Sequence, residues 1–199
     1  MHKLCLFLSV CALCSMPNIS VAFEVNDKAA LQEIENRLQI KSQMIGKFEQ
    51  KKSLPQLPHL LLSNGILAIS DKYGISWRVQ EPIPSHLILD GRQASDDPLT
   101  KQIAYPLLHI LRGDFSELDK LFEISTENNK KYWQLRLLPK SEMFNKIITQ
   151  IEITGNRKIE KIRLIEANSA VTEMLLYDLH SVDVTDPLLV AEFPDAQAQ

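Results

Sequence analysis

The last third of the chain is a series of short runs in which apolar and polar residues alternate. Alternation gives a β-strand one apolar and one polar face, because successive side chains point to opposite sides of a sheet. The connections between the runs are too short for helical crossovers, and Gly155-Asn156 is a typical turn. The pattern predicts an antiparallel meander with strands at 132–138, 147–153, 159–165 and 171–179.

The residues before the meander predict helices and more strands. A helix is expected from residue 27 to about residue 42, capped by Asn26 or Asp27, because Leu31, Ile34 and Leu38 fall at helical spacing. The other expected elements, in chain order, are a strand at 45–50, a proline-containing loop at 54–59, strands around Ile75-Trp77-Val79 and Leu87-Leu89, a polar loop at 91–98, a helix at 99–111 that Pro106 kinks or splits, a short helix at 115–122 and a looser segment at 183–193.

This order of elements predicts a single domain of the α+β class. No βαβ alternation is present, so the sheet should be mostly antiparallel. A sheet of this kind that curls around a helical element leaves a concave apolar interior. A lipid chain or another apolar ligand is the kind of molecule that such an interior holds.

The first 22 residues have the features of a secretory signal peptide. A short basic head is followed by an apolar run at 4–13, and small residues stand at Ser20 and Ala22. Cleavage is expected after Ala22, which leaves an exported, soluble chain of residues 23–199. The alternative is a membrane anchor, for which the apolar run is too short.

All three cysteines, Cys5, Cys11 and Cys14, lie in that first segment. The mature chain is therefore expected to contain no disulfide, no catalytic thiol and no thiolate metal site. A lipid-modified cysteine needs a small residue before it, and Val10 and Leu13 do not meet that requirement.

The charge and the polar motifs exclude several functions. The net charge is −3 and no basic stripe is present, which argues against a nucleic-acid partner; Lys51-Lys52 and Lys130-Lys131 are typical of solvated turn edges. No histidines stand at metal-ligand spacing, and no Gly-x-Ser-x-Gly motif occurs. The pairs Asp96-Asp97 and Asp183-Asp186 could serve as catalytic carboxylates, but cap and turn roles are commoner. We expect no enzyme activity, no metal and no cofactor.

A set of spaced residues resembles a known family. The set comprises Phe48-Glu49-Gln50, Gly65, Trp77, Pro82, Asp90-Gly91, Tyr105-Pro106-Leu107-Leu108, Gly113-Asp114-Phe115, Leu137-Leu138-Pro139-Lys140 and Phe193-Pro194. In this order and spacing it is similar to the periplasmic outer-membrane lipoprotein carriers of the LolA family. The resemblance implies an unclosed antiparallel β-barrel, or half-barrel, with helices lidding an apolar cavity.

The resemblance also implies a function. Members of that family are non-enzymatic carriers that move acylated lipoproteins through the periplasm toward the outer membrane, between an inner-membrane donor and an outer-membrane acceptor. A monomeric carrier of the acyl chains of a lipoprotein or another lipid is therefore expected. The alternative on the same fold is a periplasmic lipid-sensing or interaction module, and a hydrolase using the acidic loops is a third hypothesis.

Two departures from the family pattern indicate a divergent member. Asp71-Lys72 stands where the family has Arg-Pro, so the role of that arginine in lid opening and cargo transfer cannot be carried over. After Gly91 a polar loop replaces an aromatic strand, which predicts a shorter or more open barrel edge. A lipid-linked pigment, a glycolipid or a polyene is then as admissible a cargo as a lipoprotein.

The candidate lipid-binding residues are apolar positions on the expected strands and lid. For each of them, ordinary core packing is the alternative role. They are Phe48, Leu67, Ile75, Trp77, Leu87, Leu89, Leu107, Leu108, Ile110 and Phe115.

Overall fold

The computed structural model of the chain describes residues 23–25, 27–89 and 106–194. The expected signal peptide, Asp90-Gly91, the loop at 91–98 with Asp96-Asp97, and residues 99–105 lie outside the described residues.

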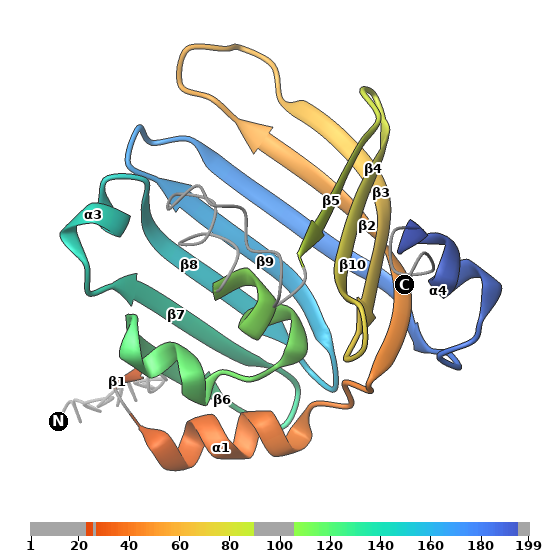
Figure 1. Cartoon of the computed structure of the whole chain (residues 1–199). Coiled ribbons are helices and arrows are strands. Elements are labelled where there is room, and N and C mark those ends of the chain that lie inside the picture. The colour runs from red at the N-terminus through yellow and green to blue at the C-terminus, as the bar shows by residue number, and fades with distance from the viewer. Residues whose placement is uncertain (1–22, 26, 90–105, 195–199) are drawn as a thin grey trace, which may run out of the picture.

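One antiparallel sheet forms the body of the molecule (Figure 1). Its strand order is β1-β6-β7-β8-β9-β10-β2-β3-β4-β5, and within the described part β1 and β5 each pair with one neighbour. The sheet is therefore not closed, which confirms the predicted α+β half-barrel. The strands are β1 (Glu24–Val25), β2 (Gln43–Ser53), β3 (Leu61–Ser70), β4 (Gly74–Glu81), β5 (Ser85–Leu89), β6 (Phe122–Asn128), β7 (Trp133–Pro139), β8 (Ile148–Gly155), β9 (Ile159–Glu166) and β10 (Val171–Ser181).

The first helix, α1 (Lys28–Arg37), is shorter than predicted. Asp27 is its N-cap, and one carboxylate oxygen accepts from the N–H groups of Ala29 at 2.9 Å and Ala30 at 3.0 Å. The expected extension to residue 42 is wrong. Leu38 has extended backbone angles, and the N–H of Gln39 donates to the carbonyl of Arg157 at 2.6 Å instead of to its own helix.

The strands around Gly65 have the predicted alternation, and their close approach explains why a glycine occupies this position. Ile75 and Trp77 of β4 are buried on one face. A Cβ atom on Gly65 would lie 1.9 Å from the carbonyl oxygen of Arg78 and 2.9 Å from the ring of Phe48. Only glycine lets β3 and β4 approach this closely at the register shift between Asn64 and Gly65.

Helices lie over the concave face of the sheet (Figure 1). Residues 106–112 are helical and belong to the predicted helix at 99–111, with Pro106 at the start of the described part. The predicted helix at 115–122 is only a 3₁₀ turn, η1 (Ser116–Lys120). Phe122 instead begins β6, a strand that the pattern does not predict.

The C-terminal strands follow the prediction with one change of phase. In β8, Ile151 and Ile153 are buried as expected, but Ile148 is buried where Ile147 was predicted. A register shift between Ile148 and Gln150 causes the change, because the extra residue reverses the facing of the strand before it. The short helix α3 (Glu142–Asn145) precedes this strand.

The segment at 183–193 contains a short helix, α4 (Pro187–Ala191). Asp186 caps it by accepting from the N–H of Leu188 at 2.8 Å. Leu189 and Phe193 pack with Ile45 and Ala68 into a small second cluster. Ile45 follows Met44 of the main core directly in β2, so this cluster lies on the opposite, outer face of the sheet.

Candidate functional site

An apolar cavity of about 190 Å³ lies between the helical residues 106–112 and the concave face of the sheet. Among the described residues, only two that line it are polar, Gln50 and Thr172. The lining residues are Gln50, Trp77, Leu87, Pro106, Leu107, Ile110, Phe144, Ile148, Ile151, Ile162, Leu164, Thr172 and Met174.

Strand register brings distant parts of the chain to this cavity. Trp77 stands opposite Leu87 in the β4–β5 pair. Met174 stands opposite Gln50 in the β10–β2 pair and opposite Ile162 in the β10–β9 pair. Directly opposed residues of neighbouring strands share a face, so both halves of the sheet contribute to one wall.

Trp77 is the largest side chain in the wall. The ring of Phe48, which is fully buried, supports it with 4.1 Å between ring centroids and 31° between planes. The packed neighbour holds the indole in place, so Trp77 presents a rigid apolar surface to the cavity.

The structure divides the ten predicted site residues into three groups. Trp77, Leu87, Leu107 and Ile110 line the cavity. Leu108 is partly buried and packs against the core without being among the described lining residues. The other five belong to the surrounding core: Phe48, Leu67, Ile75, Leu89 and Phe115.

Sequence reasoning missed most of the wall that the C-terminal half supplies. Ile151, Ile162 and Met174 lie on alternating runs that were recognised as strands, but not as part of the site. The signal that could have found them is the pairing of β10 with β2, which places these runs beside Trp77.

Beyond the polar lining residues Gln50 and Thr172, the concave face carries a charged pair, Lys52 and Glu166. Lys52 stands opposite Thr172, and its amine lies 2.6 Å from a carboxylate oxygen of Glu166. The hydroxyl of Thr172 donates to the same oxygen at 3.4 Å. The cavity therefore has an apolar floor and a polar outer end at this side of the sheet.

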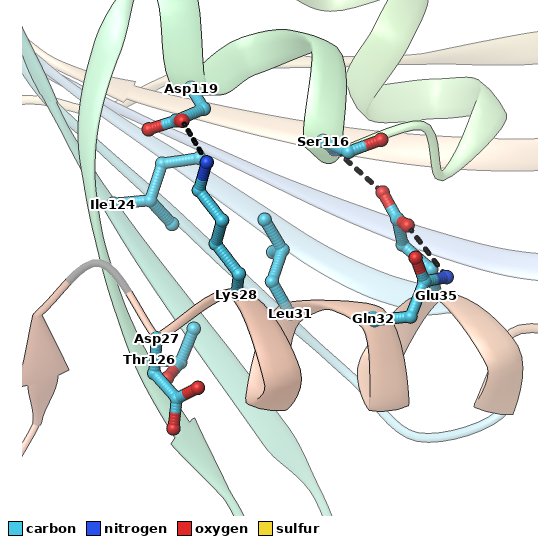
Figure 2. A pocket seen from close by; sticks show the side chains of 9 residues that line it. All are labelled: Asp27, Lys28, Leu31, Gln32, Glu35, Ser116, Asp119, Ile124 and Thr126. Carbon is cyan, nitrogen blue, oxygen red and sulfur yellow. Dashed lines mark hydrogen bonds and ion pairs between the residues drawn. The ribbon is translucent and has the colours of Figure 1, made fainter.

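A second cavity, of about 180 Å³, lies between α1 and η1 and is more polar (Figure 2). Lys28 and Asp119 approach to 3.8 Å across it, and Glu35 accepts from the N–H of Ser116 at 2.6 Å. These contacts tie η1 to α1, so the polar groups here have a structural role.

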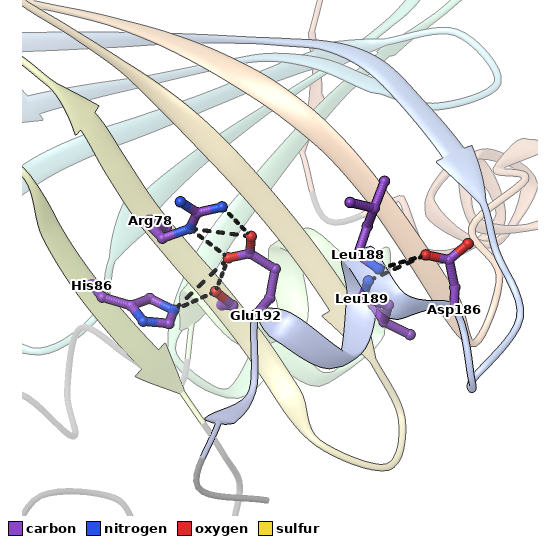
Figure 3. Close-up of polar contacts among 7 residues, drawn as sticks. Arg78, His86, Asp186, Leu188, Leu189 and Glu192 are labelled. Atoms are coloured by element: carbon purple, nitrogen blue, oxygen red, sulfur yellow. Dashed lines mark hydrogen bonds and ion pairs between the residues drawn. The ribbon is translucent and has the colours of Figure 1, made fainter. Parts of the chain in front are cut away.

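A polar cluster fastens α4 to the outer face of the sheet (Figure 3). Glu192 is only 2% exposed, and its carboxylate accepts from the guanidinium of Arg78 at 3.0 and 3.1 Å and from the hydroxyl of Ser76 at 3.1 Å. The hydrogen bond to Glu192 raises the pKa of Arg78 above its ordinary value, despite the opposing effect of burial. His86 contacts the hydroxyl of Ser76 at 2.7 Å.

The candidate carboxylates that the structure describes have cap and turn roles. The hydroxyl and N–H of Thr185 donate to Asp183 and lower its pKa, and Asp186 caps α4. No group of three or more histidine, cysteine or acidic residues is arranged to hold a metal ion within the described residues. Nor does that part of the chain contain a helix of the length and hydropathy needed to cross a membrane.

The model of the family described as outer membrane lipoprotein carrier protein LolA matches residues 40–189, about three quarters of the chain. The chain belongs to the LolA family. LolA is a family of carrier proteins, and the half-barrel with helices over its concave face is the LolA-like fold. A search of the curated proteins found no significant match.

Solved structures similar to this LolA family member share little sequence with it. A LolA superfamily protein from Nitrosomonas europaea is 11% identical, with 81% of this chain and 96% of that chain covered and a TM-score of 0.43. An outer membrane lipoprotein-sorting protein domain from Vibrio parahaemolyticus is 12% identical, with 82% and 97% covered and a TM-score of 0.35. A DUF1329 family protein from Desulfovibrio piger is 8% identical, with 81% and 96% covered and a TM-score of 0.39.

Proposed function

We propose that this chain is a non-enzymatic periplasmic carrier that holds an acyl chain of a lipoprotein or another lipid in the apolar cavity and moves it toward the outer membrane. Membership of the LolA family supports the carrier role. The single observation that carries the proposal is the cavity wall, in which apolar side chains from both halves of the sheet and from the helical residues 106–112 face one another.

The physics of acyl chains favours this use of the cavity. Each methylene group that leaves water for an apolar environment contributes about 0.8 kcal/mol. A carrier needs no reactive group for this, and the described lining residues include no ionisable side chain. The side-chain amide of Gln50 can donate hydrogen bonds to an ester or carboxyl group at the polar end of the cavity.

The size of the cavity implies that its cover moves. An engineered apolar cavity of about 150 Å³ holds one benzene molecule, so 190 Å³ accommodates about seven carbon atoms. A longer acyl chain needs more room, which the helical residues 106–112 provide if they move away from the sheet. Leu107 is only partly buried and packs against the core, and Arg112 of the same segment donates to the carbonyl of Ser70 at 3.5 Å.

Extraction of the native protein tests the proposal directly. The protein is isolated from the periplasm and extracted with organic solvent, and the extract is examined for lipids by mass spectrometry. A co-purifying acyl lipid is the expected result. If no lipid is recovered, and the purified protein also takes up no fluorescent fatty acid, the carrier hypothesis fails.

Two adjacent leucines provide a matched test of the cavity. Leu107 lines it, whereas Leu108 is partly buried on the same helical segment without being a described lining residue. Leu107→Gln should lower the affinity for a fluorescent fatty acid about tenfold, since it places an amide in the apolar wall. Leu108→Gln should keep nearly normal affinity. Equal losses in both variants, after a urea-unfolding check that both are folded, would contradict the site.

The periplasmic location, the monomeric state and the two membrane partners follow from the same proposal. Export is tested by fractionating cells and sequencing the N-terminus of the periplasmic form, which should begin at Phe23. Photo-crosslinking in intact cells should capture one protein of each membrane. Capture of a single partner by a protein with an empty cavity would favour the interaction-module alternative.

A further inference from the structure

The hairpin formed by β2 and β3 carries an unusual group of exposed leucines. Leu57 is 46% exposed, Leu60 54%, Leu61 49% and Leu62 59%. They lie in the connection after β2 and at the start of β3, where the hairpin extends beyond the neighbouring strand ends (Figure 1). Exposed apolar residues that cluster in one patch mark an interaction site more often than exposed apolar residues that are scattered singly.

The leucines lie on both faces of the hairpin. Leu61 stands opposite Lys52, on the concave side, and Leu62 stands opposite Lys51. Because consecutive strand residues point to opposite sides, Leu61 and Leu62 face away from each other. A protein surface that docks on a strand covers one face, whereas a lipid layer entered by the tip surrounds both.

The charge of the hairpin suits an anionic surface. No Asp or Glu occurs from Gln50 to Ser70, although the whole chain has a net charge of −3. Lys51 is exposed, and Lys52 is paired with Glu166. Both lysines lie near the end of β2, beside the turn, and so they flank the leucines at the level where phosphate groups would lie.

Several backbone N–H groups at the tip are either absent or already hydrogen-bonded, which favours an apolar surrounding. Pro55 and Pro58 have no N–H group to leave unsatisfied. The N–H of Leu57 donates to the carbonyl of Leu54 at 3.0 Å, and the strand pairing extends to Lys52 and Leu61. Fewer unpaired donors lower the cost of bringing the turn among acyl chains.

We propose that the β2–β3 hairpin is a membrane-docking element, which inserts Leu57, Leu60, Leu61 and Leu62 into the surface of an anionic lipid layer. This goes beyond the carrier role and does not depend on what the cavity holds. Gln50 lines the cavity, and Lys52 is the next residue of β2 on the same face. A docked hairpin therefore brings the polar end of the cavity close to the lipid surface.

Vesicle flotation tests the proposal with the purified full chain. The vesicles contain phosphatidylethanolamine with phosphatidylglycerol, and phosphatidylcholine vesicles are the neutral comparison. The test variant replaces Leu57, Leu60, Leu61 and Leu62 with serine. Leu188→Ser is the matched control, because Leu188 is 67% exposed in α4 on the outer face. Lys51→Gln examines the charge, and thermal unfolding verifies that each variant is folded.

The wild-type protein should float with the anionic vesicles. The fourfold serine variant should partition about a hundredfold less, and Leu188→Ser should behave as the wild type. Lys51→Gln should weaken binding to anionic vesicles about fivefold and leave binding to neutral vesicles unchanged. Absence of wild-type binding, or equal binding by the serine variant, would overturn the proposal.

A further experiment distinguishes binding of the hairpin to a protein partner from binding to a lipid layer. With a photo-reactive residue at position 60, lipid adducts are expected in vesicles and in cells. A protein adduct in cells together with no vesicle binding would also overturn the proposal. Fatty-acid uptake is measured in parallel: if uptake fails while the hairpin still binds vesicles, the carrier role fails and the docking element stands.

Discussion

The affinity of the cavity for fatty acids should depend steeply on chain length, up to a limit that its volume sets. Each methylene group buried in the cavity contributes about 0.8 kcal/mol, which is about a fourfold gain in affinity. The volume of 190 Å³ accommodates about seven carbon atoms, by comparison with the cavity of about 150 Å³ that holds benzene. Filling it should contribute about 5–6 kcal/mol before the costs of association.

Beyond that length the gain per methylene should fall. Further carbon atoms have to displace Leu107 and Ile110 from the core before they can enter. Part of the free energy of burial is then spent on moving the helical residues 106–112. A plot of the logarithm of affinity against carbon number should therefore bend near seven carbon atoms.

Competition against a fluorescent fatty acid measures the series, with fatty acids that differ only in length. Quenching of Trp77 by a brominated fatty acid gives a second readout, because Trp77 lines the cavity while Trp133 is fully buried beside Phe115. Trp77→Phe should abolish the quenching and keep the binding. Affinity that does not change with chain length would refute the assignment of this cavity to acyl chains.

Three further predictions concern the framework that holds the cavity. Arg78→Ala should lower the free energy of urea unfolding by about 2–3 kcal/mol, because it leaves the carboxylate of Glu192 buried without the guanidinium, with the Ser76 hydroxyl at 3.1 Å and the His86 ring at 4.0 Å as its described side-chain neighbours; an unchanged midpoint would contradict this. Gly65→Ala should cost at least about 2 kcal/mol, measured in the same way, since its Cβ would clash with the carbonyl of Arg78. The hydrogen bond that Tyr132 donates to Glu127 raises the pKa of the phenol above 10.0, so this contribution to stability is present at neutral pH and is lost as pH rises through the raised pKa. An ultraviolet titration should show the raised pKa in the wild type and its return toward 10.0 in Glu127→Gln.

The strands that alternation predicts are those with one buried face. Trp133, Leu135 and Leu137 are fully buried in β7, with half-buried residues between them, so the pattern is visible in the sequence. In β6 the buried positions include Ser125, Thr126 and Glu127. Polar residues at buried positions erase the alternation, which is why this strand could not be predicted.

The sequence predicts an apolar cavity, but it does not predict which residues line it. Trp77 and Phe48 are neighbours on one concave face, yet one lines the cavity and the other is solid core. Phe48 packs against the Trp77 ring and is fully buried, whereas Trp77 reaches the cavity, and no local sequence pattern records this difference in tertiary packing. Met174 and Ile162 were missed for another reason: the register that places β10 beside β2 joins residues far apart in the chain.

The pairing of β10 with β2 also sets the order in which the protein can fold. Among the described strands it is the one pairing that joins the strands of residues 43–89 to those of residues 122–181, and it lies inside the sheet, not at its edge. Contacts between such distant residues form late, because a long loop has to close first. Until residues 171–181 have been made, β2 presents an unpaired edge and the two walls of the cavity remain separate. A partly synthesised chain can therefore form hairpins, but the cavity is enclosed from both halves of the sheet only after residues 171–181 have been made.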